Sequence, residues 1–511
     1  MLVCSIFFIS LGYLIRLSMY LPLWVQKYKE PRTEIRKIKN TYYKYAVGYK
    51  YNPEKKRTDK ITKELLGKIM EQEGFVPSPK HVIKQKNVQI PVVDIKTYGV
   101  YNLFTSLLAQ DCNSLLALFP GITGQTLLTI AMMRFAYQSP IKRMPFQHAH
   151  DYCSQSWATN GINDKTITAV LKHIGENRNI LADWMKSRLG ISKTAQDNFV
   201  MIDSTHIPTL SENLHVNALG YNPHHSYDPQ IRLMYIFSAQ MKQPVYYRLI
   251  NGNITDVTSM KMCVDELNVK DVVFIADKGF YSKTNVAALK SNFLNFIIPL
   301  YRNNNLIDYK PLQEANFKKG IKNYFTYQNR VIWYYEYEKD KQTLITYLDE
   351  KLRVEEEADF LSRVKTHPDK YKEADFFEKV NQLGTLTLIS HLPEKHTAQQ
   401  IYEIYKQRNE IEIMFDAYKH FLVADKTYMQ DRYVMEGWLM ANFIAMIAYY
   451  RLYKLLKDAN KLSKYSPKDI VEISKSIYQT KIRDTWIRSE ITKKIKDLFK
   501  LIKIDYLTQR S

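Results

Sequence analysis

Cysteine is scarce in this chain, and its few cysteines form no metal-binding or disulfide pattern. Four of them stand far apart among 511 residues, without a Cys-x2-Cys pair: Cys4, Cys112, Cys153 and Cys263. This spacing excludes a zinc ribbon and a disulfide framework and fits a reducing compartment. The stretch His148-Ala-His150-Asp151-Tyr-Cys153 lacks a second ligand pair, so we expect it to be structural and not a zinc site.

A nucleotide-binding P-loop is missing as well. The nearest segment, Gly121-Ile-Thr-Gly124-Gln-Thr, has no lysine to hold a phosphate, which argues against an ATP-driven motor. Acidic residues are too few to balance the basic ones: 52 Asp and Glu face 73 Lys and Arg, for a net charge of +21. Such an excess favours a polyanionic partner, nucleic acid first and an anionic membrane surface second, over a small metabolite.

The first 25 residues are largely apolar, and Arg16 is their only charge. A charge inside a membrane span costs about 2.5–3.5 kcal/mol on insertion scales. The segment also lacks the leading positive charge and the small-residue cleavage site of a signal peptide. We therefore expect a buried or peripheral helix, or an over-extended start, with no stable membrane association; a membrane anchor is the minority interpretation. The basic runs at 36–39 and 55–57 fit a solvated face and a phosphate track equally well.

From residue 198 onward, short apolar runs separated by helical segments predict a mixed α/β core. The expected strands are 199–202, 232–239, 244–250, 271–276 and 296–300, with helices near 255–267 and 285–290. The first and fourth strands each end in an aspartate, Asp203 and Asp277. If these two strands are neighbours, the carboxylates meet at one edge of the sheet. The aromatic-rich stretch 324–347 predicts a β insertion further along.

A helix predicted from Thr397 to about residue 421 carries one charged face. At about 100° per residue, its four polar positions fall within an arc of roughly 60°: Tyr405, Arg408, Glu412 and Lys419. A solvated face explains such a helix, and a turn or cap explains either aspartate, when each is taken alone. Together, two strand-end aspartates and a carboxylate from a distant helix can complete a hard-oxygen cage for Mg²⁺.

These residues resemble the motifs of the DDE transposases of the IS-four type, which carry a Tyr-Arg-Glu-Lys signature. The matching segments are Ile-Asp203-Ser-Thr, Ala-Asp277-Lys-Gly-Phe-Tyr-Ser and Tyr405-x2-Arg408-x3-Glu412-x6-Lys419. Further likenesses are Gly220-Tyr-Asn, Asp228-Pro-Gln-Ile and Gly252-Asn-Ile-Thr-Asp256. The resemblance covers roughly residues 196–425 and departs at Lys278, where some relatives carry Arg or another residue.

The resemblance implies a ribonuclease-H-like α/β core interrupted by a β-rich insertion domain, with helical N- and C-terminal regions. The expected parts are a basic helical DNA-binding region (1–195), the first part of the core (196–304), the insertion (305–395), the catalytic helix (396–425) and a helical C-terminal region (426–511). The implied activity is cut-and-paste transposition, in which DNA strands are cleaved and transferred at the terminal inverted repeats of the element. The expected partner is double-stranded DNA, bound by a homodimer at the nucleoid in a prokaryotic cytoplasm.

The resemblance also implies a role for each acid. Asp203, Asp277 and Glu412 are expected to be catalytic and to hold two Mg²⁺ ions, with Mn²⁺ as an alternative. Two such ions stabilise both the attacking and the leaving oxygen of an in-line displacement at phosphorus. Asp416 lies one turn beyond Glu412 on the same helical face and is the alternative third carboxylate.

The remaining signature residues are expected to contact DNA. Tyr405, Arg408 and Lys419 are assigned to phosphates, with salt bridging and packing as the alternative. Lys278 either contacts backbone phosphate or pairs with a carboxylate. Trp333 is the candidate ring on which a flipped base stacks, and a role in the sheet core is its somewhat stronger alternative. Two other functions stay open: a metal-dependent nuclease without strand transfer, and a degenerate copy that only binds DNA.

Overall fold

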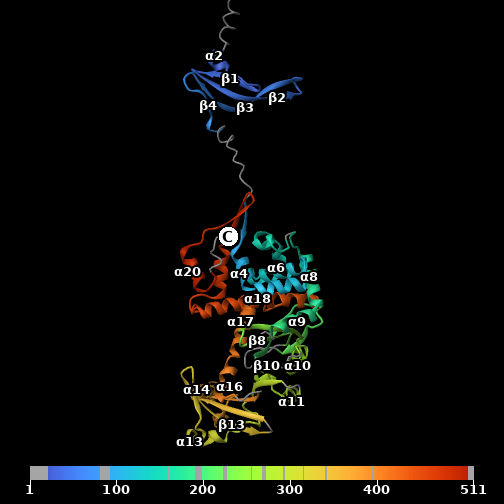
Figure 1. Ribbon diagram of the computed structural model, residues 1–511, viewed down its shortest axis with the longest axis vertical. Helices are drawn as coiled ribbons and strands as arrows, with labels where there is room; N and C mark the ends of the chain where they lie inside the picture. Colours follow the sequence, from blue (N-terminus) through green and yellow to red (C-terminus); the bar gives the residue numbers. More distant parts are fainter. Residues whose placement is uncertain are drawn as a thin grey trace, which may run out of the picture. The chain divides into compact units, whose positions relative to one another are not determined.

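The computed structural model describes residues 21–80, 93–158, 160–189, 198–221, 227–254, 256–267, 272–291, 294–314, 316–339, 342–392 and 396–504. The chain divides into two compact units, one of residues 1–94 with 481–485 and a larger one of residues 95–480 with 486–511 (Figure 1). Most of the apolar N-terminal segment, residues 1–20, lies outside the described residues. Among the helices that are described, none combines the length and hydropathy needed to cross a bilayer.

The smaller unit is built on an antiparallel sheet and not on the helices expected for residues 1–195. A short helix, α2 (Leu23–Gln26), precedes strands β1 (Thr33–Ile38), β2 (Thr41–Asn52), β3 (Arg57–Met70) and β4 (Gly74–Pro77), which pair in that order. In β2, Tyr42 and Lys44 are buried, whereas Tyr43 and Tyr45, each of which follows one of them, are more open. This period of two is that of a strand, and tyrosine favours strands. The helical prediction is therefore wrong for residues 33–77.

The helical prediction is confirmed further along the same region. After β5 (Val93–Thr97) come α4 (Gly99–Leu107), α5 (Ala109–Leu118), α6 (Ile122–Tyr137), α7 (Met144–His150), α8 (Asp164–Glu176) and α9 (Arg178–Leu189), with short turns η1 (Ile141–Arg143) and η2 (Tyr152–Gln155). The long helix α18 (Arg432–Asp458) packs against α6, α8 and the sheet (Figure 1). Because it is covered on several sides, almost every residue from Val434 to Ala448 is buried apolar.

The last part of the chain is helical with one exception. Helices α19 (Pro467–Lys475) and α20 (Lys493–Leu501) flank two short strands, β16 (Tyr478–Ile482) and β17 (Thr485–Arg488), which pair with each other. The expectation of a wholly helical region at 426–511 is therefore wrong for this hairpin.

The core of the larger unit is one mixed sheet. Its strands are β6 (Asn198–Pro208), β7 (Ala218–Tyr221), β8 (Tyr227–Ser238), β9 (Gln243–Asn251), β10 (Val272–Ile275) and β11 (Asn295–Pro299), with α10 (Asp256–Leu267) before β10 and η3 (Lys278–Phe280) and α11 (Lys283–Ser291) after it. Strand β8 pairs antiparallel with both β6 and β9, and β10 lies parallel between β6 and β11. The first and fourth predicted strands are therefore neighbours, which is the arrangement that the site requires.

The insertion continues this sheet. Strands β12 (Tyr324–Tyr327), β13 (Arg330–Lys339), β14 (Gln342–Asp349) and β15 (Thr385–His391) follow one another, and β15 pairs with β11. Within the described residues the sheet has ten strands, ordered β12–β13–β14–β15–β11–β10–β6–β8–β7 with β9 beside β8. The insertion also holds α12 (Lys310–Gln313), α13 (Phe317–Ile321), α14 (Glu350–Thr366), α15 (Glu373–Lys379) and the turn η4 (Val380–Gln382), so it is β-rich only in part.

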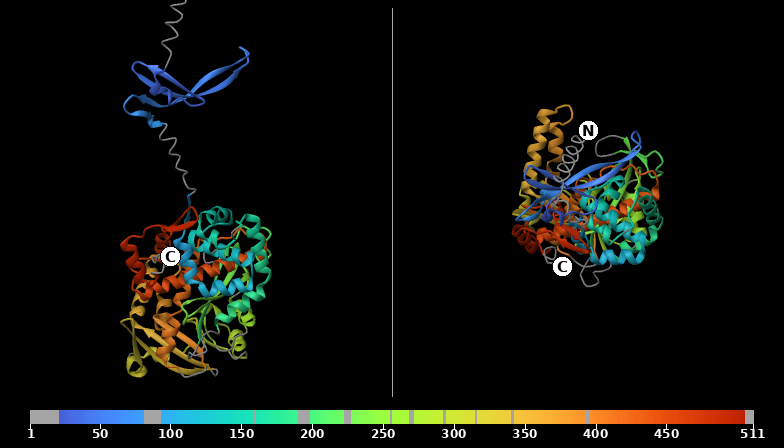
Figure 2. Two further views of the ribbon diagram at one scale, coloured as in Figure 1. Left: turned by 45° about the horizontal axis from the view of Figure 1, so that its top comes forward. Right: turned by 90° about the horizontal axis from the view of Figure 1, so that it is seen from above.

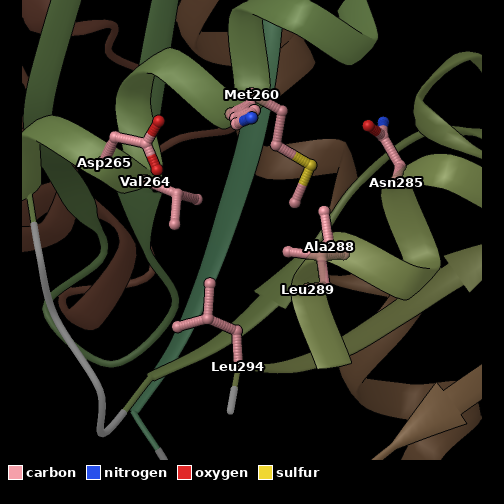
Figure 3. A pocket seen from close by; sticks show the side chains of 8 residues that line it. Met260, Val264, Asp265, Asn285, Ala288, Leu289 and Leu294 are labelled. Carbon is pink, nitrogen blue, oxygen red and sulfur yellow. The ribbon is translucent and has the colours of Figure 1, made fainter. Parts of the chain in front are cut away.

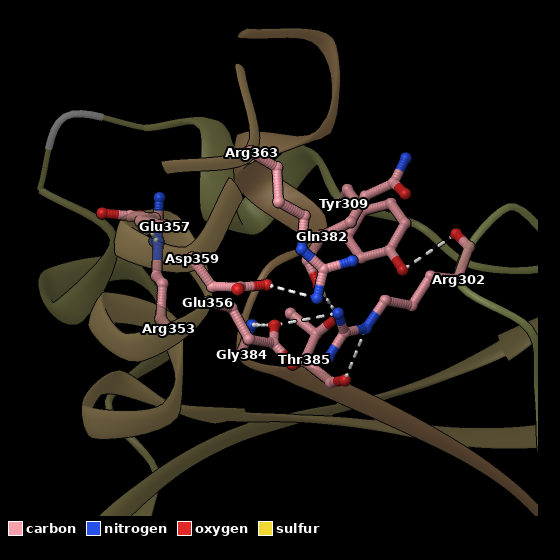
Figure 4. A network of polar contacts seen from close by, with 10 residues as sticks. All are labelled: Arg302, Tyr309, Arg353, Glu356, Glu357, Asp359, Arg363, Gln382, Gly384 and Thr385. Carbon is pink, nitrogen blue, oxygen red and sulfur yellow. Dashed lines mark hydrogen bonds and ion pairs between the residues drawn. The ribbon is translucent and has the colours of Figure 1, made fainter. Parts of the chain in front are cut away.

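A polar network fixes helix α14 to the end of the core sheet (Figure 4). Arg302 follows β11 and donates two hydrogen bonds to Glu356 of α14, at 2.9 and 3.0 Å, and one to the Thr385 carbonyl at 3.1 Å. Glu356 also accepts from the Gly384 amide at 2.7 Å. Gly384 has a φ of +69°, and a Cβ there would lie 2.6 Å from the Asp349 carbonyl oxygen, so glycine is required.

Candidate active site

The two aspartates stand level on neighbouring strands. Ile275 of β10 pairs with Met201 of β6, an offset of 74, and the same offset takes Asp277 to Asp203. Asp277 follows β10, as predicted, and precedes the turn η3. Asp203 does not end its strand, because β6 goes on pairing with β8 as far as Pro208. The side chain of Asp277 is 36% exposed and that of Asp203 is 20% exposed, so both carboxylates keep access to solvent.

A helix brings the third acid to the same place. Helix α17 (Asn409–Asp416) buries Ile411, Met414 and Phe415 and leaves Glu412 exposed. The Phe415 ring lies 6.0 Å from the ring of Tyr235, the residue of β8 that pairs with Asp203. The apolar packing that holds the helix on the sheet therefore also sets Glu412 on the side of Asp203.

Arg408 joins the three acids. One terminal nitrogen of its guanidinium lies 3.2 Å from Asp203 Oδ2, and the other lies 3.8 Å from Asp277 Oδ1 and also binds Glu412. The Arg408 side chain is 15% exposed. Burial alone lowers the pKa of Arg408, but the surrounding carboxylates and Tyr405 outweigh it and the pKa is raised. The structure thus gathers the three predicted carboxylates around one positive charge.

The predicted catalytic helix is divided into three segments. Helix α16 (Ala398–Lys406) ends before Arg408, α17 follows, and η5 (Ala417–Phe421) is a π-helical turn. At the junction the Arg408 amide donates to the Tyr405 carbonyl, a tighter turn than that of an α-helix. The assumed 100° per residue therefore holds from Arg408 to Glu412, which are in contact, and fails beyond Asp416. The continuous helix predicted for 397–421 is wrong for this reason.

The other signature residues differ in their surroundings. Tyr405 lies beside Arg408; burial raises its pKa, and the neighbouring guanidinium opposes this with a smaller effect. Lys419 lies in η5, where burial lowers its pKa and the charges acting on it are those of Asp425 and Asp416. Tyr405 is therefore part of the acid cluster, whereas the structure shows no such link for Lys419 in the described residues.

The two proposed DNA contacts outside the signature are both near aromatic rings. Lys278 is exposed, with its ammonium group 5.4 Å from the centre of the Tyr301 ring. Trp333 is half-buried against the small apolar cluster of α12, α13 and β14, and its indole N–H donates to Glu350 Oε2 at 3.0 Å. One edge of the Trp333 ring is thus used in packing; its role as a stacking platform stays a prediction.

A hollow of about 320 Å³ opens at the α16–α17 junction, the junction that also contains Arg408. Its lining residues come from the β12–β13 turn, the end of β14 and the α16–α17 junction: Tyr327, Gln328, Arg330, Asp349, Tyr402, Lys406 and Asn409. Lys406 is half-buried over the Tyr402 ring, at 5.1 Å, and burial lowers its pKa. Sequence reasoning missed this hollow because its residues come from three separate segments.

Arg134 is a further residue that sequence reasoning missed. It is 3% exposed and donates to the carbonyl of Leu422 just after η5, to the carbonyl of Ser139 at 3.0 Å and to Asn442 Oδ1 at 2.8 Å. Burial lowers its pKa to about 10. Arg134 thereby anchors the C-terminal end of the catalytic helix to the helical layer. The signal was available, since it is the one charge within the apolar stretch 127–136.

Neither the stretch from His148 to Cys153 nor the cavity between α10 and α11 forms a ligand site in the described residues. His148 Nε2 bonds the Trp157 carbonyl at 3.0 Å, and Asp151 accepts from the Cys153 amide and the Tyr137 hydroxyl, in line with the structural role expected for this stretch. A cavity of about 20 Å³ lies between α10 and α11 (Figure 3). Its mainly apolar lining leaves room for one water molecule at most, so it is no ligand site.

The donor atoms of the acid cluster are of the type that binds a divalent cation. Asp203, Asp277 and Glu412 offer carboxylate oxygens, the ligands that Mg²⁺ prefers, and all three reach one cationic group. As the side chains stand, no set of three or more His, Cys, Asp or Glu among the described residues converges on a metal position. In this cluster Arg408 holds the place of the cation.

A comparison with known families covers the part of the chain that holds this site. Residues 194–448 match the family model described as the transposase DDE domain. The range contains all three acids and Arg408, so this part of the chain matches a transposase DDE domain.

Among solved structures, the chain is similar to a piggyBac transposase, seen by cryo-electron microscopy in its synaptic complex with hairpin DNA. The two are 12% identical, the match covers 74% of this chain and 78% of the other, and the TM-score is 0.36. At these values the similarity carries no argument about fold or mechanism. A comparison with curated proteins finds no match.

Proposed function

We propose that this protein is an IS-four-type transposase with a ribonuclease-H-like core, which cuts double-stranded DNA at the terminal inverted repeats of its element and joins the freed ends to target DNA. The observation that carries the proposal is the shared contact of Arg408 with Asp203, Asp277 and Glu412. The acids come from three separate elements, and Glu412 lies 135 positions after Asp277. The protein acts as a homodimer on DNA, at the nucleoid in the cytoplasm.

The three carboxylates would hold Mg²⁺, as two ions, with Mn²⁺ as an alternative. Bound there, the metal supplies charge stabilisation for the attacking and leaving oxygens at phosphorus. The Arg408 guanidinium is a planar fork that matches two phosphate oxygens. Once the guanidinium is released from the carboxylates, it would therefore hold the scissile phosphate. Tyr405, whose pKa is raised, keeps its hydroxyl proton at neutral pH and can donate a hydrogen bond to a phosphate oxygen.

The DNA next to the cut would follow the cationic side of the site. The hollow beside the helix junction places Lys406 and Arg330 near two tyrosine rings, a combination that suits a phosphate and a sugar or base. Lys278 is exposed and adjacent to Asp277, so it can reach a neighbouring phosphate. Lys419 would bind DNA further along the helix, and Trp333 would stack on a base.

The test is cleavage of an end-labelled duplex that carries the inverted repeat read from the ends of the element. Wild type is compared with Glu412→Gln and with the matched control Asp416→Asn; Asp416 is 73% exposed and lies 3.4 Å from His420. We expect Mg²⁺-dependent cuts at the repeat boundary, lost in Glu412→Gln and kept in Asp416→Asn.

Other outcomes change the assignment. Cuts that survive Glu412→Gln and disappear in Asp416→Asn would move the third ligand to Asp416. Cutting without joining to a target duplex would indicate a nuclease. Repeat-specific binding by wild type without any cut would indicate a degenerate, DNA-binding copy.

A further inference from the structure

In the described part of the chain, no third strand lies beside the outer half of the β2–β3 hairpin. Strand β1 pairs with residues 41–46 of β2, and β4 pairs with residues 67–70 of β3. In the described part of the chain, residues 47–52 and 57–62 therefore form strand pairs only with each other, and Figure 2 shows them projecting from the sheet. At the base of this segment the Val47 amide donates to the Arg32 carbonyl at 2.9 Å, and Arg36 donates to the Thr62 hydroxyl at 2.6 Å. A two-stranded ribbon in water buries little and adds little stability. We call residues 47–62 the β-ribbon.

The β-ribbon exposes side chains that a solvated hairpin does not need. Tyr49 and Tyr51 are 64% and 61% exposed, although tyrosine is a costly residue to leave in water. Residues directly opposite one another in an antiparallel pair share a face. One face of the β-ribbon therefore carries Tyr49 opposite Lys60 and Tyr51 opposite Thr58.

The other face holds the acid of the paired strands. Asp59 stands opposite Lys50, accepts a hydrogen bond from Asn52 Nδ2 at 2.9 Å and pairs with Arg57 Nε at 3.0 Å. The tyrosine face thus offers hydroxyl groups and aromatic edges beside the Lys60 ammonium group, which lies 3.3 Å from Glu34 Oε2 of β1, while Asp59 lies on the other face. Such a face suits a partner rich in hydrogen-bond acceptors and negative charge.

Charge around the β-ribbon points the same way. Residues 21–80 contain 15 Lys and Arg and 7 Asp and Glu, a net charge of +8 out of the +21 of the whole chain. At the tip, Lys55 and Lys56 are exposed, and no acidic side chain of the described residues forms an ion pair with either. Two free ammonium groups at the end of a ribbon match phosphates on either side of a groove.

We propose that the β-ribbon reads duplex DNA, with its tyrosine face toward the base edges in the major groove and Lys55 and Lys56 on the flanking phosphates. The major groove, about 12 Å wide, admits a two-stranded β-ribbon. The inference rests on the proposed function and deepens it, because it names the surface that would select the terminal repeat before cutting.

The test measures binding of the full-length protein, without Mg²⁺, to a short fluorescein-labelled duplex carrying the terminal repeat and to a scrambled duplex. The variants are Lys55→Gln/Lys56→Gln and Tyr49→Ser/Tyr51→Ser. The control for charge is Lys365→Gln/Lys370→Gln, a pair of exposed lysines in and just after helix α14. Thermal melting of each variant verifies that the fold is intact, as expected for exposed side chains.

Each variant has its own expected result. Each phosphate contact contributes about 0.9 to the slope of log affinity against log salt, so the lysine variant should lower the slope by about 1.8. The tyrosine variant should keep the slope and reduce the preference for the repeat over the scrambled duplex by about tenfold. The control should change neither quantity.

The inference and the proposed function fail separately. If both β-ribbon variants bind like wild type while wild type still cuts the repeat, the β-ribbon proposal is overturned and the function stands. If the variants lose binding as expected but wild type cuts nothing in Mg²⁺, the β-ribbon proposal stands and the function fails. If wild type itself shows no preference for the repeat, the β-ribbon proposal is overturned.

Discussion

Replacing Arg408 by glutamine should destabilise the protein when no divalent metal is present. In the structure this one guanidinium lies among Asp203, Asp277 and Glu412 and supplies the positive charge nearest to all three. Glutamine keeps much of the side-chain volume and some hydrogen bonding but carries no charge. The variant therefore leaves three carboxylates facing one another without a cation.

The size of the effect follows from the contacts. A pair of unit charges at 4 Å is worth about 4 kcal/mol at an effective dielectric constant of 20. Glu412 is 51% exposed and Asp277 36%, so water screens a large part of that energy. We expect the free energy of unfolding to fall by about 1–3 kcal/mol, a range between exposed and buried ion pairs. The control Arg363→Gln breaks an exposed pair with Asp359, which water screens, so we expect no measurable change in stability.

The assay is urea unfolding in EDTA and in Mg²⁺. A ligand that binds the folded state stabilises it according to its affinity. In wild type Mg²⁺ must displace Arg408 from the carboxylates, whereas in Arg408→Gln the carboxylates are free. Mg²⁺ should therefore stabilise the variant more than wild type. Equal stability of the two proteins in EDTA, or a smaller Mg²⁺ effect in the variant, would refute the view that Arg408 holds the place of the metal.

Two further predictions concern the helical layer. Burial raises the pKa of Asp151 from 3.8 to about 6, so its stabilising contribution is present at low pH and lost as the pH rises through 6. The side chain of the variant Asp151→Asn is neutral at every pH. From pH 7 to pH 5 the free energy of unfolding of wild type should therefore rise by about 1 kcal/mol relative to that of the variant, as measured by urea unfolding at each pH. A difference that does not change with pH would contradict the raised pKa. Replacing Arg134 by methionine keeps the packing but leaves the Leu422 carbonyl and Asn442 without their donor, so unfolding free energy should fall by about 3 kcal/mol. A loss below about 0.5 kcal/mol would show that Arg134 does not anchor the helix end.

The site was easier to predict from the sequence than the fold around it. Asp277 closes a short apolar strand, and the predicted proximity of Arg408 and Glu412, four residues apart, is seen in the structure, where the two side chains form an ion pair. Lys419 lies beyond a π-helical turn, which no count at a fixed angle per residue can anticipate. Asp203 was placed at a strand end because the polar Asp-Ser-Thr run hides the continuation of β6, which its pairing with β8 supports.

The errors in the flanking regions have a common physical cause. Residues 1–195 were predicted to be helical and basic, but in β2 buried Tyr42 and Lys44 alternate with more open residues at the period of a strand. The insertion was expected as a β-rich domain that interrupts the core, and the prediction did not include the pairing of β15 with β11, which makes one sheet of core and insertion. Pairing between strands nearly a hundred residues apart is set by tertiary packing, which a local pattern does not record.

The most direct test of the central claim locates the metal on the chain. Fe²⁺ replaces Mg²⁺ at sites of oxygen ligands, and with ascorbate and peroxide it generates radicals that cut the backbone close to the ion. The account predicts cuts next to Asp203, Asp277 and Glu412 that excess Mg²⁺ suppresses, that Glu412→Gln weakens and that Asp416→Asn leaves unchanged. Cuts confined to other parts of the chain, or cuts at these acids that Mg²⁺ does not suppress, would contradict it.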